Sequence, residues 1–163
     1  MSITDYSISG KEYNLHGRQD FNTTVSMNEL FQAAVKKAQE QASGVGIVVR
    51  CEELPEVEGK REPMKNFLEM LMGFMLEQFS DGHKLFLHVS CEEIKDGATP
   101  EEQKHYHIRF HTNIAPDTQW KAVHKDQLSQ CQQIISAHGG TFMVNNINNA
   151  GYLFSITLPG KLK

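Results

Sequence analysis

Histidine is the residue type whose spacing most clearly suggests chemistry in this chain of 163 residues. His105, His107 and His111 lie two and four residues apart in a segment, residues 105–113, where polar and apolar residues alternate. This alternation indicates a strand, so the three imidazoles share one face, and two histidines at i and i+2 can hold zinc with a third ligand. A solvent-facing row of titrating imidazoles gives the same pattern. We therefore assign no metal site and keep zinc at these three residues as a hypothesis.

The cysteines do not indicate a catalytic or metal centre. Cys51, Cys91 and Cys131 are odd in number and far apart, which disfavours a disulfide framework or a cysteine-based zinc site. No Ser-His-Asp or Cys-His arrangement stands out from the spacing of the 8 histidines. We expect three buried or half-buried thiols and no catalytic residue.

Periodic patterns predict the elements that position these side chains. Helices are expected over about residues 28–42, 61–79 and 126–137, and strands over about 45–52, 84–92, 105–113, 141–147 and 152–158. Ser26 and Glu29 form a capping box before the first helix, and the second helix is apolar nearly all round, so it must be buried. This order predicts an α+β fold: a two-layer sandwich with a mixed, mostly antiparallel sheet and helices on one face.

The amino-acid composition disfavours two classes of binding partner, nucleic acids and membranes. The net charge is −4 and the 16 Lys and Arg residues are scattered, so we expect no nucleic-acid or membrane binding. No apolar run approaches the roughly 20 residues that cross a membrane, and no secretory signal is visible, so we expect a cytoplasmic protein. Residues 1–19 are polar and weakly patterned, and we treat them as an extension before one domain over 20–163.

Four segments carry a resemblance to a known family. They are Val25–Leu30, Gly44–Arg61, Ile134–Gly140 with its His-Gly-Gly turn, and Gly151–Pro159 with its Leu-Pro ending. In order and spacing they resemble the ATP-binding domain of sensor histidine kinases, in the superfamily shared with DNA gyrase and the heat-shock chaperone ATPases. The resemblance covers about residues 20 to 160 and implies a Bergerat-type ATPase fold.

The residues that the resemblance places around nucleotide depart from the family's pattern. On the helix that bears the N box, Met70 and Phe74 stand where the family has asparagines, and Phe74 takes the place of the one that helps to hold magnesium. Magnesium takes oxygen ligands, and a phenylalanine ring has none. Phe74 is therefore expected to fill the pocket with apolar volume.

The glycine-rich motifs are altered as well. Thr112, Asn113, Ile114 and Pro116 lie where the family has Asp-x-Gly-x-Gly, so the carboxylate that receives the adenine amino group is absent. Lys125 and Gln127 replace glycines at the start of the third helix. Only about nine residues separate Pro116 from that helix, which is too few for a long mobile lid.

The resemblance and these departures together give the functional expectation. The chain looks like a degenerate histidine-kinase-like ATPase domain without a cofactor, acting as an interaction or scaffold module in bacterial signal transduction. Its partner would be a sensor kinase, a response regulator or a second copy of itself. The alternative is a Mg-ATP-binding histidine kinase or phosphotransfer subunit whose pocket uses Thr112, Asn113 and Lys125. A small-ligand module that reuses the old pocket has no residue signature of its own.

Overall fold

The computed structural model describes residues 23–42, 44–94, 103–115, 118–147 and 151–162. In chain order the elements are β3 (Thr24–Ser26), α1 (Met27–Gln41), β4 (Gly46–Cys51), β5 (Glu56–Glu58), α2 (Arg61–Glu77), β6 (Lys84–Ile94), β7 (Gln103–Thr112), α3 (Ala122–Ala137), β8 (Thr141–Ile147) and β9 (Gly151–Leu162). The extension expected over residues 1–19 lies outside the described residues.

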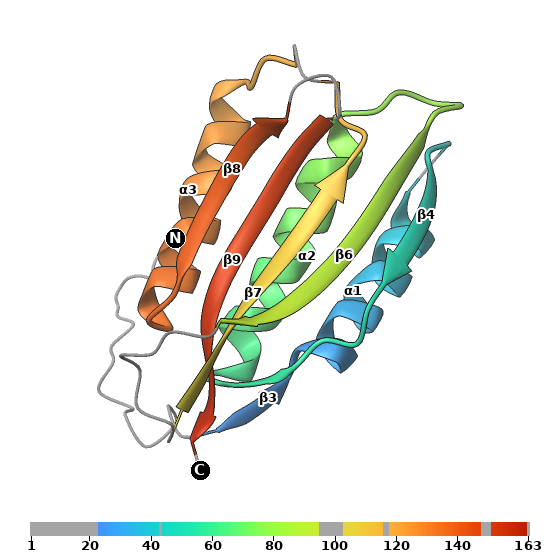
Figure 1. The fold of residues 1–163 in the computed structure, drawn as a ribbon. Coiled ribbons are helices and arrows are strands. Elements are labelled where there is room, and N and C mark those ends of the chain that lie inside the picture. The colour runs from blue at the N-terminus through green and yellow to red at the C-terminus, as the bar shows by residue number, and fades with distance from the viewer. Residues whose placement is uncertain (1–22, 43, 95–102, 116–117, 148–150, 163) are drawn as a thin grey trace.

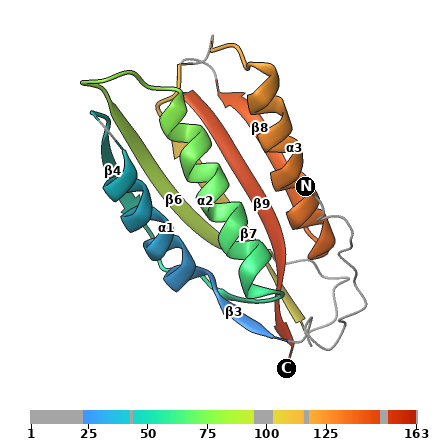
Figure 2. The ribbon, with the colours of Figure 1, turned by 180° about the vertical axis from the view of Figure 1, so that it is seen from behind.

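The strands form one sheet, and the helices cover one of its faces. The strand order is β3-β5-β9-β7-β6-β4, and β8 pairs with the first part of β9. The β4–β6 pair is parallel, whereas the other described pairs are antiparallel. Figures 1 and 2 show α1, α2 and α3 side by side on the same face. This is the predicted α+β sandwich with a mixed, mostly antiparallel sheet.

Helix α2 is the centre of the core. It lies between α1 and α3 and over the sheet, so apolar side chains on most of its circumference are removed from water (Figure 2). Its buried residues are Met64, Phe67, Leu68, Leu71, Met72, Phe74 and Met75. Although α2 is strongly apolar, no helix of the described residues is long and apolar enough to cross a membrane.

Two boundaries differ from the sequence prediction for tertiary reasons. Residues 56–58 were expected to be part of a connection but form β5, because Val57 pairs with Val25 of β3 and with Gly160 of β9. Helix α3 begins at Ala122, four residues before the predicted start, because His124 accepts a hydrogen bond from the Lys121 backbone N–H and caps the helix there.

The His-Gly-Gly turn joins the end of α3 to the start of α2. The His138 Nδ1–H donates to the Ile134 carbonyl at 2.8 Å, and the Nε2 atom accepts from the backbone N–H of Lys60 at 3.1 Å. A side chain at Gly59 would collide with the His138 ring. Gly139, at φ +80°, then ends α3 in the left-handed conformation that glycine adopts without strain. This connection requires a neutral imidazole.

The His138 connection predicts a pH-dependent stability. Burial lowers the pKa of His138 below its ordinary value of 6.5. The His138 ring therefore binds a proton more tightly in the unfolded chain than in the folded one. The stabilisation that the neutral ring provides is present above pH 6.5 and is lost as the pH falls through the folded-state pKa. We expect the free energy of unfolding, measured by urea denaturation, to fall between neutral and mildly acidic pH.

The matched control separates His138 from the other histidines. The pKa values of His107 and His111 are also lowered, mainly by burial. A His138→Gln variant should flatten the pH dependence more than His107→Gln does, because His138, unlike His107 in the described structure, accepts a backbone hydrogen bond that protonation would break. An equal slope in wild type and His138→Gln would contradict this interpretation.

Candidate functional site

The two positions aligned with the N box lie on α2 and face apolar surroundings. Met70 is half-buried and packs against the core, whereas Phe74 is 1% exposed. The α-helical period brings Phe74 toward α3 and the sheet, which is the side on which the resemblance places nucleotide. Neither side chain offers an oxygen to a metal ion.

Phe74 is surrounded by rings from three other parts of the chain. Its centroid lies 5.1 Å from that of Trp120, 5.5 Å from His124 and 5.7 Å from Phe154. Trp120 in turn lies 4.7 Å from Tyr152. These are ordinary aromatic packing distances, and the tilted and edge-to-face geometries are favourable ones. The connection before α3, α3 itself and β9 therefore meet α2 through one aromatic cluster.

His124 adds a polar contact to this cluster. Its Nε2 atom lies 3.1 Å from Glu77 Oε1 on α2, and its Nδ1 atom accepts from the Lys121 backbone N–H at 3.4 Å. Both ring nitrogens are thus engaged, and the side chain is 8% exposed. The arrangement resembles a histidine–carboxylate pair of an enzyme, but here it ties α3 to α2. Sequence reasoning missed Trp120 and His124, although a tryptophan beside a predicted helix start was a signal for packing.

The polar side chains at the end of β7 form hydrogen bonds with other parts of the chain. The Thr112 hydroxyl donates to the Tyr152 carbonyl at 2.8 Å and accepts from the Ile114 backbone N–H at 3.2 Å. The Asn113 amide lies over the start of β6: its Oδ1 accepts from the Phe86 N–H, and its Nδ2 donates to the Lys84 carbonyl. Ile114 is 1% exposed. These side chains extend the sheet and the core.

The start of α3 combines an exposed cation with a half-buried amide. Lys125 is exposed, and its backbone N–H is already bonded to the Lys121 carbonyl. Gln127 is half-buried, and its Oε1 is a buried oxygen without a hydrogen-bond partner among the described residues. Pro116 lies outside the described residues. The structure therefore brings Phe74 and Thr112 close to the same aromatic cluster, whereas Asn113 turns toward β6.

The three histidines share one face of the sheet, as predicted. It is the face opposite α1, α2 and α3, which we call the uncovered face because no described helix lies over it. Ile108 and Phe110, which alternate with His107, Arg109 and His111, face the core.

Contacts on this face do not form a metal centre. His111 pairs with His88 of β6 at a ring separation of 6.1 Å, and Arg109 binds Glu92 at 2.7 Å. Among the residues that the structure describes, no group of three or more His, Cys, Asp or Glu side chains is arranged to hold a metal ion. The zinc hypothesis for His105, His107 and His111 thus has no geometric support.

The cysteines are protonated thiols at neutral pH. Burial, and then the charge of Glu52, raise the pKa of Cys51 to about 11. Burial raises the pKa of Cys131 to about 12 and also raises that of Cys91. Contrary to expectation, Cys51 is exposed. A thiol with a raised pKa is a poor nucleophile at neutral pH, because little of it is thiolate.

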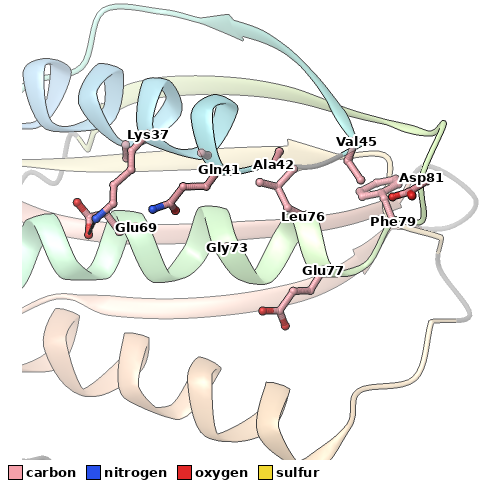
Figure 3. A pocket seen from close by; sticks show the side chains of 12 residues that line it. Lys37, Gln41, Ala42, Val45, Glu69, Gly73, Leu76, Glu77, Phe79 and Asp81 are labelled. Carbon is pink, nitrogen blue, oxygen red and sulfur yellow. Dashed lines mark hydrogen bonds and ion pairs between the residues drawn. The ribbon is translucent and has the colours of Figure 1, made fainter.

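A groove of about 460 Å³ runs between α1 and α2 (Figure 3). Two of its charged groups form an ion pair, since Lys37 of α1 binds Glu69 of α2 at 3.1 Å. Glu77 points away from α1, toward α3, where it meets His124. Gly73 leaves open space between the helices, because a Cβ there would meet nothing within 4 Å. The groove therefore reflects small residues at a helix contact and shows no catalytic arrangement.

Of the comparisons with known proteins, the one with solved structures finds matches. Neither the models of known protein families nor the curated proteins contain a match to this chain. Among solved structures, the mycobacterial sensor histidine kinase MprB matches with a TM-score of 0.60 and 14% identity, over 86% of this chain and 100% of its own.

Two further kinase structures give the same result. The catalytic domain of histidine kinase ThkA matches with a TM-score of 0.59 and 19% identity, over 86% of this chain and 98% of its own. A histidine kinase from Burkholderia phymatum matches with a TM-score of 0.56 and 13% identity, over 86% and 70%. The described part of this chain therefore has the fold of a histidine-kinase-type ATPase domain.

Proposed function

We propose that this chain is a histidine-kinase-type ATPase domain that has lost nucleotide binding and acts in the cytoplasm as an interaction or scaffold module in bacterial signal transduction. The observation that supports the proposal most is the position of Phe74. The sequence resemblance aligns this residue with the magnesium-holding asparagine, and its ring packs against Trp120, His124 and Phe154. Atoms packed at these separations leave no room for a purine nucleotide without displacement of the cluster.

The polar groups near the cluster support the same proposal. A nucleotide pocket needs donors and acceptors that are free to meet the ligand, as well as a charged group for the strongest contacts. The hydroxyl of Thr112 and the amide of Asn113 are bonded to main-chain groups of the protein. Binding a nucleotide through them would require breaking those bonds.

The uncovered sheet face supports a role in protein binding. Val48, Phe86 and Met143 are 45%, 51% and 54% exposed on this face. Arg109 lies between them, and interfaces are enriched in arginine, methionine and aromatic residues. A sensor kinase or a response regulator is the partner class that the fold suggests.

The second candidate function is a Mg-ATP-binding phosphotransfer subunit. Lys125 is the observation that favours it, because this cation is exposed in the first turn of α3, where a helix attracts anions. The aromatic cluster and the bonded side chains of Thr112 and Asn113 make it the weaker candidate.

A thermal melt of the full chain with and without millimolar Mg-ATP or ADP tests the loss of nucleotide binding. A ligand at 100 times its Kd stabilises by about 2.7 kcal/mol, which is a shift of about 5 to 10 °C for a domain of this size. We expect no shift of that kind. A shift of several degrees that Lys125→Ala abolishes would contradict the proposal and establish the second candidate.

Truncating Phe74 tests its structural role. Phe74→Ala should destabilise the protein by about 3 to 5 kcal/mol, because it removes a buried ring and leaves a cavity. The adjacent variant Gly73→Ala is the control on the same helix, and it should stabilise by about 0.5 to 1 kcal/mol, because alanine fits the helix and meets no atom. Urea denaturation measures both. A Phe74→Ala variant as stable as wild type would show that the ring does not carry the packing.

Binding of purified partners tests the interaction role. The sensor kinases and response regulators of the source organism, tested one by one by biolayer interferometry, should include at least one that binds the full chain. Met143→Lys, which places a charge on the uncovered face, should weaken that binding at least tenfold without changing the melting temperature. Failure of every candidate to bind would contradict the interaction role.

A further inference from the structure

Among the described residues, no strand pairs with the outer edge of β4. β4 is the last strand in the sheet order, and among the described residues it pairs with β6 alone (Figure 1). On the β6 side, Gly46 donates to the His83 carbonyl at 3.1 Å and Glu52 donates to the Val89 carbonyl at 3.0 Å. Because backbone groups of successive residues in a strand point to opposite sides, the N–H and C=O groups of the odd-numbered residues of β4 point away from β6.

Two of the features that usually protect an edge strand are missing from β4, in which Arg50 is the one charged residue. Its sequence, Gly-Ile-Val-Val-Arg-Cys, contains no proline and no lysine, and its pairing with β6 is regular over all six residues. Val48 is 45% exposed and lies beside Phe86, which is 51% exposed. A regular, apolar edge of this kind is a template for pairing with another chain.

We infer that two copies of the chain associate through β4, antiparallel about a two-fold axis at Val49, into one continuous sheet. This inference goes beyond the proposed function and does not rest on it. It follows from three properties of β4 and α1: the register of the main-chain groups, the placement of Arg50, and the charges of the helix beside the edge.

The backbone fixes the register. When Val49 lies opposite the second copy's Val49, Ile47 lies opposite the second copy's Cys51, so all three outward-facing residues pair and about six main-chain hydrogen bonds form. Val48 then lies opposite Arg50 on the uncovered face. A shift to the next register would place Arg50 opposite the second copy's Arg50, which like-charge repulsion disfavours, and a shift the other way would leave Cys51 unpaired.

The charges of α1 are complementary under the same symmetry. Gln32 and Lys36 line the groove between α1 and β4 together with Val49, and Glu29 lies on the same helix face seven residues before Lys36. The two-fold axis brings the two α1 helices side by side and antiparallel, so Lys36 of each copy lies toward Glu29 of the other. Two ion pairs of this kind favour a second copy of the chain, rather than an unrelated extended segment, as the partner that pairs with β4.

Sedimentation velocity of the full chain tests the inference. We expect a monomer–dimer equilibrium with a dissociation constant on the order of 1 to 100 µM. Val49→Pro should abolish the dimer, because proline removes an N–H that faces away from β6 and is tolerated on edge strands. Val48→Lys should weaken the dimer at least tenfold by placing a lysine opposite Arg50. Val123→Lys, which replaces an exposed apolar residue of α3, should leave it unchanged.

A charge exchange on α1 separates the proposed geometry from other dimers. Glu29→Lys and Lys36→Glu should each weaken the dimer, and the double variant should restore it to within about threefold of wild type. Thermal melts verify that every variant is folded, and Val48→Lys carries the test if Val49→Pro is not. A monomer at all concentrations, a dimer that survives both β4 variants, or a dimer that Val123→Lys disrupts would overturn the inference.

Discussion

The rest of the structure depends on the burial of α2. This helix has α1 on one side, α3 on the other and the sheet beneath it, so an apolar side chain is the stable choice at most of its positions. Phe74 follows from this constraint, because its ring joins α2 to α3, to β9 and to the connection that carries Trp120. The packing that stabilises the domain thus runs through the aromatic cluster that the proposed function places in the former nucleotide site.

Polar side chains around this core connect elements of the protein to one another. His138 joins α3 to the first residue before α2, His124 joins α3 to Glu77, and Asn113 bonds to the main chain at the start of β6. Each of these contacts satisfies a main-chain or charged group that would otherwise be exposed or unpaired. These bonds hold together the described elements of a histidine-kinase-type fold. Partner binding is proposed for the uncovered sheet face, and self-association for β4.

Most of the fold could be predicted from the sequence, because local patterns of apolar and polar residues indicate most of its helices and strands. The period of the second helix and the alternation around Ile108 and Phe110 indicated the right elements and the right faces. β5 could not be found in this way, since Val57 becomes a strand residue only by pairing with Gly160 far along the chain. The core position of Phe74 was predictable, but its contact with Trp120 and the binding of Asn113 to β6 depend on how distant segments meet.

A crystal structure of the full chain, grown or soaked with magnesium and a non-hydrolysable ATP analogue at millimolar concentration, tests the central claim most directly. The claim predicts that the space between α2 and α3 holds no nucleotide and that the Trp120 ring still packs on Phe74. Electron density for the analogue between these helices, with the Trp120 ring displaced from Phe74, would contradict it.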